Sequence, residues 1–164
     1  MNDFVALPEL RCPVMRIEDD WVDYNGHLNQ AFYGVIFDRS IDHALYPAGL
    51  GPDYIKQRNC SFMTVESHTC FIRELLKTDP VQVTMRVLDV DEKRLHTFSE
   101  MKHAKDGWLA ATSEYMFLHI DMSVRRTAPW PQDLRARLDA LKAASASLPW
   151  PERAGRRIAI PRKV

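Results

Sequence analysis

Residues 21–33 read WVDYNGHLNQAFY, and the rest of the chain is organised around this segment. It gathers short polar residues around one glycine, and a mostly apolar segment follows it directly. Short polar side chains before a helix cap its free backbone N–H groups, and the helix dipole is positive at that end. The same N–H groups can polarise a carbonyl held there, as in an oxyanion hole. The stretch therefore predicts a loop that leads into a helix and carries chemically useful groups to its start.

The segment from about residue 29 to residue 46 is the predicted helix. Its first half is apolar on nearly every side, and the first acidic residue is Asp38. A helix that is apolar all round is a buried helix. Pro47 and Gly49 are typical of the end of a helix. We therefore expect one long buried helix.

Outside the helix the apolar residues follow the period of strands. Residues 81–87 alternate strictly between apolar and polar, which indicates a half-buried strand. Asp106-Gly107 is a hairpin signal. One antiparallel sheet wrapped around one long central helix is the α+β architecture that this order predicts. The expected strands lie at residues 14–17, 62–72, 81–87, 94–103 and 108–120.

The composition shifts after residue 124. Residues 125–164 hold ten Lys or Arg against three Asp or Glu. Pro131 suits the first turn of a C-terminal helix, and residues 147–164 are expected to form an extended tail. We predict a main domain at residues 1–124, with the C-terminal helix and basic tail of residues 125–164 packed on it. Three leucines share one face of the predicted helix: Leu134, Leu138 and Leu141.

Length, charge and cysteine content exclude several classes of protein. The 164 residues suit one domain with a core, and a formal net charge of +0 points to neither nucleic acid nor membrane. Three cysteines are an odd number without the spacing of a disulfide framework. No apolar run approaches the roughly 20 residues that span a membrane, and no leader segment opens the chain. We expect a soluble cytoplasmic protein with reduced thiols.

Asp23, Asn25, His27 and Asn29 follow the pattern Asp-x-Asn-x-His-x-Asn, and the aromatic residue Tyr33 comes after it. This pattern resembles the loop-to-helix signature of hot-dog-fold acyl-CoA thioesterases, the group that includes 4-hydroxybenzoyl-CoA thioesterase and the plant acyl-carrier thioesterases. The order of one helix followed by strands agrees with that fold. More loosely, the chain resembles the betainyl-CoA thioesterases of carnitine breakdown, a subgroup of this family.

The resemblance implies a hot-dog fold and hydrolysis of a small acyl-CoA thioester to the free acid and coenzyme A, with betainyl-CoA as one candidate. It implies no cofactor, because coenzyme A is part of the substrate. It also implies a homo-oligomer, a dimer or tetramer, with the active site at the subunit interface. We expect neither nucleic acid nor membrane as a partner.

The position of Asp23 is, in the resembling family, that of the catalytic carboxylate or close to it. A carboxylate can activate water or attack the thioester carbonyl, and the sequence leaves both roles open. The structural alternative is that Asp23 caps a turn or the helix. His27 is expected to orient Asp23, to bond the thioester or to fill a buried polar site.

Gly26 suits a backbone that turns sharply, or approaches the substrate closely, just before the helix. In that case the backbone N–H groups near Gly26 to Leu28 would point at the thioester oxygen. Asn25 and Asn29 are expected to position the reacting groups, although asparagine is equally at home in turns and helix caps.

Four aromatic residues surround Asp23 in the sequence. They suit a pocket for a flat aryl acyl group, a cage for a quaternary ammonium ion, or ordinary core packing. The candidates for substrate binding among them are Trp21, Tyr24 and Tyr33, and the fourth residue is Phe32.

Glu66 is the candidate for a second active-site acid. Several hot-dog enzymes use a carboxylate on or near the central helix of the other subunit, and this chain has only Asp38 and Asp42 in that helix. Strict alternation places Glu66 on the same strand face as Thr64 and His68. The alternative for Glu66 is a solvated or interface-paired strand residue.

No metal site is expected, because the histidines show no ligand spacing with one another or with the cysteines. The absence of a Gly-x-Ser-x-Gly elbow disfavours an α/β-hydrolase thioesterase. The basic C-terminal segment suits contact with coenzyme A phosphates, contact with nucleic acid, or exposure to solvent alone. Candidates for holding coenzyme A are Arg73, Lys77, Arg125 and Arg126.

Three alternative functions stay open beside the thioesterase. One is another reaction on the same fold, such as enoyl-CoA hydration. The second is a non-catalytic acyl-CoA-binding or regulatory hot-dog protein, which the presence of Asp23 disfavours. The third is nucleic-acid binding through the basic tail, where only Trp130 and Trp150 interleave with the basic residues.

Overall fold

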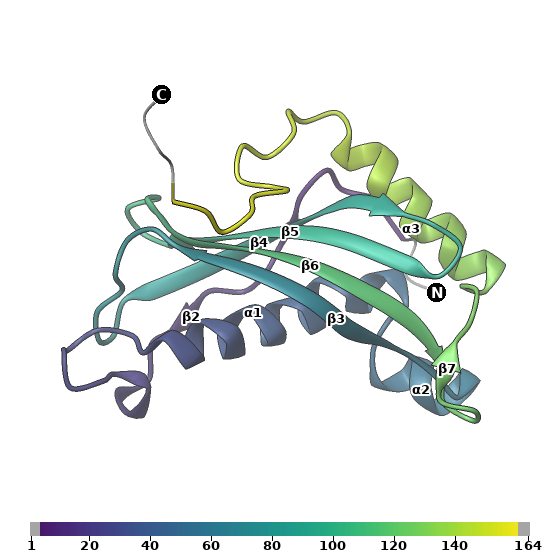
Figure 1. The fold of residues 1–164 in the computed structure, drawn as a ribbon, viewed down its shortest axis with the longest axis horizontal. Coiled ribbons are helices and arrows are strands. Elements are labelled where there is room, and N and C mark those ends of the chain that lie inside the picture. Colours follow the sequence, from purple (N-terminus) through teal and green to yellow (C-terminus); the bar gives the residue numbers. More distant parts are fainter. Residues whose placement is uncertain (1–3, 161–164) are drawn as a thin grey trace.

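The computed structural model describes residues 4–160 as one antiparallel sheet with a long helix on each face (Figure 1). The elements are β1 (Leu10–Arg11), β2 (Met15–Arg16), η1 (Asp19–Trp21), α1 (Gln30–Leu45), η2 (Tyr46–Ala48), α2 (Pro52–Arg58), β3 (Cys60–Phe71), β4 (Pro80–Val90), β5 (Arg94–His103), β6 (Leu109–Asp121), β7 (Arg126–Thr127) and α3 (Gln132–Ser145). The predicted α+β class and hot-dog architecture, with a C-terminal helix, are confirmed.

The four long strands determine the shape of the sheet. Its order is β1-β4-β5-β6-β3, with β2 also paired to β4 and β7 to β6. Strands β4, β5 and β6 follow one another in the chain and in the sheet, and β3 lies at the edge beside β6. Within residues 4–160, β3 pairs only with β6, so the other edge of this 12-residue strand is free.

Helix α1 covers the inner face of the sheet, and one side of it forms the core. Asn29 begins the helix by accepting the N–H of Ala31 on Oδ1 at 3.0 Å. Burying one apolar side chain stabilises the fold by about 1.5–3 kcal/mol relative to leaving it exposed to water. The opposite side of α1 is exposed at Gly34, Asp38 and Asp42, so the expectation of a helix buried on every side is wrong. The buried apolar residues of α1 are Tyr33, Ile36, Phe37, Ile41, Ala44 and Leu45.

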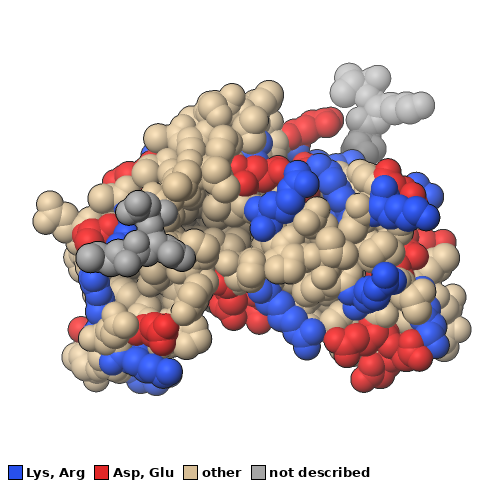
Figure 2. Space-filling view, turned by 180° about the vertical axis from the view of Figure 1, so that it is seen from behind, with Lys and Arg blue, Asp and Glu red and all other residues tan. Residues whose placement is uncertain are grey.

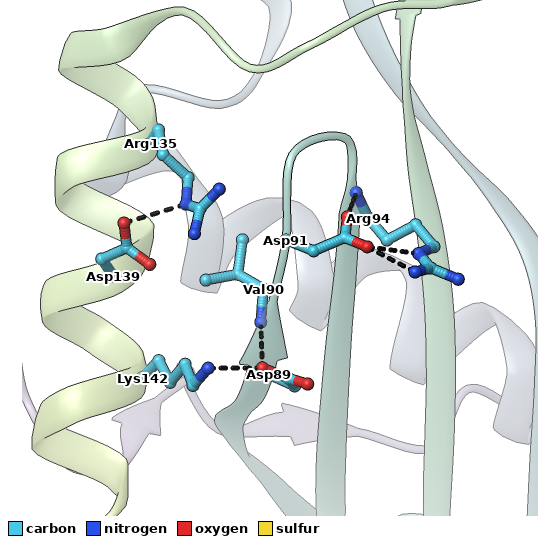
Figure 3. A network of polar contacts seen from close by, with 7 residues as sticks. All are labelled: Asp89, Val90, Asp91, Arg94, Arg135, Asp139 and Lys142. Carbon is cyan, nitrogen blue, oxygen red and sulfur yellow. Dashed lines mark hydrogen bonds and ion pairs between the residues drawn. The ribbon is translucent and has the colours of Figure 1, made fainter.

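Helix α3 packs on the outer face of the sheet, over β4 (Figure 1). Lys142 of α3 bonds Asp89 of β4 at 2.5 Å, and Figure 3 shows this contact beside the turn that Asp91 and Arg94 close. Both pairs are exposed, so each stabilises the fold by no more than about 1 kcal/mol. The three predicted leucines are buried: Leu134, Leu138 and Leu141. The predicted boundary at residue 124 stays a prediction.

Strand β3 carries a β-bulge at Val65. Thr64 pairs with Phe117 of β6, and Glu66 pairs with the adjacent residue of β6, Met116, so Val65 has no partner of its own. The extra residue reverses the alternation of side chains, so Thr64 faces α1 whereas Glu66 faces the opposite side of the sheet. The prediction that Thr64 and Glu66 share one face is therefore wrong.

Two smaller differences concern the ends of the chain. The N-terminal arm, for which no strand is predicted before residue 14, supplies β1, which pairs with β4. The loop after β6 supplies β7, a short strand that the sequence pattern does not indicate.

None of the helices in residues 4–160 combines the length and the apolar character that a membrane crossing requires.

Candidate active site

A tight turn from Asp23 to Gly26 stands directly before α1. The N–H of Gly26 donates to the carbonyl of Asp23 at 3.0 Å, and the N–H of Asp23 donates to the carbonyl of His27 at 3.1 Å. Gly26 has a φ of +85°, in the left-handed region where a side chain is strained. A Cβ there would meet nothing within 4 Å, so the backbone conformation, and not crowding, requires glycine.

The base of this turn is fastened on two sides. A short bridge joins Val22 to Leu28 across the turn. The N–H of Leu28 donates to the carbonyl of Leu75 at 2.7 Å, and the N–H of Asn29 donates to the carbonyl of Trp21 at 2.9 Å. The turn is thus held by the connection between β3 and β4, and the start of α1 is fixed relative to the sheet.

The carboxylate of Asp23 has one occupied and one free oxygen. Oδ1 accepts the N–H of Asn25 at 2.8 Å and lies 3.8 Å from Nδ1 of His27. Within residues 4–160, no hydrogen bond reaches Oδ2. The Asp23 side chain is 16% exposed, so a small molecule can reach it. Asp23 therefore caps its turn, and it also presents an oxygen that is available for chemistry.

His27 stands beside this carboxylate without a full hydrogen bond to it. The separation of 3.8 Å between Nδ1 and Oδ1 is an ion-pair distance and exceeds that of a hydrogen bond. Its side chain is 34% exposed, which argues against the interpretation of His27 as a buried polar residue. The structure thus brings Asp23, Asn25 and His27 together, with Asn25 contributing its backbone.

Only part of the Gly26–Leu28 segment has backbone N–H groups without a hydrogen-bond acceptor in residues 4–160. The N–H groups of Gly26 and Leu28 both donate to carbonyls of the chain, so these two cannot bind a thioester oxygen. Asn29 uses its side chain to cap the N–H of Ala31. The N–H of Gln30, the first residue of α1, has no acceptor within the helix, as at every helix start. The N–H of His27 also has no acceptor within residues 4–160, so Gln30 and His27 are both candidates for an oxyanion donor.

The aromatic residues around Asp23 point in different directions. Trp21 is 5% exposed and stacks on Phe32, with ring centroids 5.6 Å apart. Tyr33, also 5% exposed, packs its edge on Phe71, and burial raises the pKa of its hydroxyl. Tyr24 at the tip of the turn is 96% exposed. Within the described chain, no ring contact joins Trp21, Tyr24 and Tyr33, so these three form no cage in one subunit.

Glu66 lies away from the Asp23 turn in a single chain. It lines a small outer-face pocket of about 300 Å³ with His68, His96 and Glu114. Glu114 there binds Nε2 of His96 at 2.6 Å and accepts the N–H of Gly155 at 2.8 Å, which fastens the C-terminal tail to the sheet. One subunit therefore does not bring Glu66 to Asp23.

A groove on the inner side of the sheet involves two acids that the sequence does not single out as site residues. It has a volume of about 400 Å³ and lies between α2, the start of β3 and the exposed side of α1. Asp38 and Asp42 stand at its rim, and Phe62 and Phe117 are among its apolar walls. The acidic residues Asp38 and Asp42 in a largely apolar helix are the sequence signal that could have predicted this groove.

A larger cavity of about 630 Å³ opens between α2 and α3 and is lined by both acidic and basic side chains.

The family of the chain follows from comparison with known proteins. The family model of the thioesterase-like superfamily matches residues 17–138, which is most of the chain. The chain belongs to the thioesterase-like superfamily. The match includes the Asp23 turn, α1 and all four long strands. It confirms the predicted resemblance and the class of enzyme, a thioester hydrolase.

Comparison of the chain with individual proteins supports the same family. The chain is 37% identical to the betainyl-CoA thioesterase of Pseudomonas aeruginosa over 142 residues, which cover 87% of the chain and 89% of that protein. It is 32% identical to the L-carnitine dehydrogenase/betainyl-CoA thioesterase of Rhizobium meliloti, over 91% of the chain and 30% of that longer protein. The structure of SAV2348 from Staphylococcus aureus in complex with CoA superposes with a TM-score of 0.86 at 29% identity, over 93% of the chain and 96% of that protein.

The basic side chains of this superfamily member are dispersed. Figure 2 shows Lys and Arg scattered over one face among acidic side chains. Arg73 stacks its guanidinium 4.2 Å from the ring centre of Trp108, and Lys77 pairs with Asp19 at 2.8 Å. Both lie in the β3–β4 connection that fastens the Asp23 turn, whereas Arg125 and Arg126 lie at the other end of β6. Arg73 and Lys77 are therefore the better placed of the four near Asp23 of the same chain.

Proposed function

We propose that this protein hydrolyses betainyl-CoA to betaine and coenzyme A, with Asp23 as the catalytic carboxylate. The observation that carries the proposal is the Asp23 carboxylate, held beside the start of α1 with Oδ2 free of hydrogen bonds from residues 4–160. The relative from Pseudomonas aeruginosa, which aligns over 87% of the chain, supports the choice of substrate. The complex of SAV2348 with CoA supports a coenzyme A ligand.

The proposed reaction uses only groups of the chain and water. In one route, Asp23 takes a proton from a water molecule while the oxygen of that water adds to the thioester carbonyl carbon. In the other route, the Asp23 carboxylate itself adds to the carbonyl carbon, and water later releases the acyl group from Asp23. The oxyanion that forms is stabilised by the N–H of Gln30 at the positive end of α1. The carbon–sulfur bond then breaks. In the first route the coenzyme A thiolate takes up the proton that Asp23 removed from water; in the second the thiolate leaves as the acyl-Asp23 anhydride forms, and it takes up a proton released when water hydrolyses that anhydride. No cofactor is required for these steps.

His27 and Asn29 have positioning roles in this proposal. His27 lies 3.8 Å from the Asp23 carboxylate and restricts the orientations that the carboxylate adopts. Asn29 holds the first turn of α1 in place, so the N–H of Gln30 keeps its direction. Asn25 contributes through its backbone N–H, and Gly26 through its left-handed conformation.

We further propose that the active unit contains a pair of subunits joined through β3. A long free strand edge readily pairs with another chain, and β3 exposes apolar side chains at Met63, Val65 and Phe71. Two copies related by a two-fold axis would join their β3 edges and run their α1 helices in opposite directions. The Asp23 turn of one subunit would then lie near the C-terminal half of α1 of the other.

Location in the cytoplasm is part of the same proposal. Coenzyme A thioesters are made and used inside the cell. The three cysteines of the described chain, Cys12, Cys60 and Cys70, are free thiols, as a reducing compartment requires.

Release of free thiol from a panel of acyl-CoAs tests the function. The panel contains betainyl, straight-chain and aryl thioesters, and it is run with the native chain, with Asp23→Asn and with Asp20→Asn. We expect turnover of betainyl-CoA and a loss of about a hundredfold or more in Asp23→Asn. Asp20, an exposed acid three residues earlier, is the matched control and should leave the rate unchanged.

Two other outcomes would change the proposal. Turnover that survives in Asp23→Asn would move the chemistry to another residue. Saturable binding of the thioesters without any turnover would favour a non-catalytic acyl-CoA-binding protein.

A further inference from the structure

The groove between α1, α2 and β3 has aromatic walls close to unpaired acids. Phe62 packs edge-on against Phe117 with ring centroids 5.3 Å apart, and Tyr115 stacks on Phe117 at 5.6 Å. Asp38 and Asp42 stand one helical turn apart at its rim. Phe117 is fully buried behind Phe62, so the groove combines the Phe62 ring and negative charge in a space of about 400 Å³.

The two acids have no cation of their own in the described chain. No Lys, Arg or His nitrogen of residues 4–160 lies within 4.0 Å of either carboxylate; Arg39, on the same helix, pairs with Glu18 instead. Partial burial and the neighbouring charge of Asp38 raise the pKa of Asp42. Like charges one turn apart on a helix repel each other. A cation bound between them would remove this cost.

The same side of α1 is open before the acids begin. Gly34, one turn before Asp38, is exposed, and a Cβ there would meet nothing within 4 Å. A glycine inside a helix costs about 0.5–1 kcal/mol relative to alanine. Packing within the described chain supplies no reason for that cost. A group that approaches α1 closely from outside the subunit would supply one.

We propose that this groove binds the trimethylammonium end of the acyl group, with Asp38 and Asp42 as its counter-charges and the half-buried Phe62 as its aromatic face. The inference rests on the proposed function, since it assigns residues to the acyl group of that substrate. A quaternary ammonium ion has no N–H to donate, so charge and aromatic faces are the means by which a protein holds it. The alternative cage of Trp21, Tyr24 and Tyr33 is not formed in one subunit.

The groove and the Asp23 turn meet only between two subunits. In Figure 1 the turn before α1 lies at one end of that helix and α2 lies at the other. Because a two-fold axis across β3 reverses the second α1, the groove of one subunit would approach the Asp23 turn of its partner. The thioester would then span the interface, with its carbonyl at one chain and its ammonium group at the other.

A pair of thioesters with the same shape and different charge tests the proposal. In 3,3-dimethylbutyryl-CoA a carbon atom replaces the ammonium nitrogen of betainyl-CoA. We measure kcat/KM and the dissociation constant for both compounds, with the native chain, Asp38→Asn/Asp42→Asn, Phe62→Leu and the control Asp20→Asn. Asp38 and Asp42 are exposed, so the double variant should keep the native melting temperature.

We expect the native chain to prefer the cationic thioester, and the double variant to lose about tenfold or more of that preference. Phe62→Leu, which keeps an apolar side chain without the π-face, should lose a smaller part, and Asp20→Asn none. An unchanged ratio in the double variant would overturn the groove assignment while leaving the thioesterase proposal intact. If no compound is turned over, the proposed function fails, and the ratio of dissociation constants still decides whether the groove selects the cation.

Discussion

Oδ1 of Asp23 accepts the peptide N–H of Asn25 at 2.8 Å, so the carboxylate that we propose as catalytic also closes the turn that carries it. The sequence offers capping and catalysis as alternative roles for Asp23. The geometry makes them compatible, because each role uses a different oxygen. A residue with two roles can be tested by substitutions that remove one role and keep the other.

Asp23→Asn and Asp23→Ala should separate capping from catalysis. An asparagine oxygen can accept the same N–H, so Asp23→Asn should keep the native stability and lose activity. Alanine leaves the turn uncapped and should lower the free energy of unfolding by about 0.5–2 kcal/mol in addition. Thermal unfolding and thiol release check both effects. Equal destabilisation by the two variants would contradict this division of roles.

Gly26→Ala should harm both stability and activity, because it forces a side chain into a φ of +85°. We expect a loss of about 1–2 kcal/mol in the free energy of unfolding. Gly107 in the β5–β6 hairpin is the matched control, since its φ is +75° and a Cβ there also meets nothing within 4 Å. Gly107→Ala should lose similar stability with little change in kcat/KM per folded molecule. If Gly107→Ala lost as much kcat/KM as Gly26→Ala, the loss of activity in both variants would come from unfolding of the whole domain and not from the Asp23 turn.

Sequence patterns correctly predicted the elements that are determined by interactions between residues close together in the chain. The start of α1 is determined by a glycine turn and an asparagine cap within a few residues, and both are visible in the sequence. The alternation at residues 81–87 was equally informative, because Val81, Val83 and Met85 are all buried in β4 as a half-buried strand requires. These parts of the fold depend on neighbours in the chain.

The parts that could not be predicted depend on distant partners. The bulge at Val65 arises from pairing with β6, some fifty residues later, and it sends Glu66 to the face away from α1. Trp21 and Tyr24 are neighbours in sequence, yet one is buried and the other stands at the tip of a turn. The groove beside Asp38 exists only because α2 folds back near β3. No periodicity in a single sequence contains this information.

Tyr54→Phe should destabilise the fold through His119. The buried His119 uses Nδ1 to donate to the carbonyl of Ala128 at 2.8 Å, so its Nε2 accepts the Tyr54 hydroxyl at 2.7 Å. Removing the hydroxyl leaves a buried acceptor unpaired, at a cost of about 1–3 kcal/mol. Tyr46→Phe, which removes an exposed hydroxyl bonded to Asp53, is the control and should cost at most about 0.5 kcal/mol. Urea unfolding of both variants measures the difference.

Asp91 should make a stability contribution that disappears in acid. Its hydrogen bond with Arg94, followed by the N–H of Lys93, lowers the pKa of Asp91 to about 2 from 3.8 (Figure 3). The unfolded state therefore binds more protons between these values, and the contribution is present above about pH 4 and lost as the pH falls toward 2. The side chain is 40% exposed, so we expect less than about 1 kcal/mol.

Unfolding of Asp91→Asn at about pH 6 and about pH 3 checks this sign. The difference from the native chain should be smaller at the lower pH. Asp20→Asn, at an exposed acid for which the described chain offers no ion pair, should show no such trend. A difference that grows in acid would contradict the assignment to the Asp91 carboxylate.

Val65→Lys should separate the subunits and remove activity together. Charged residues on a free strand edge prevent edge-to-edge pairing in natural proteins, and Val65 is an exposed residue of β3. Val124→Lys adds the same charge at an exposed valine beside β7 and should leave both mass and rate unchanged. Light scattering at micromolar concentration and thiol release are measured on the same samples. Because the proposed site takes Asp23 from one chain and the groove from the other, activity should fall in proportion to the dimer. A native chain that is monomeric and fully active would contradict the shared site, since Asp23 and the groove would then have to work within one subunit.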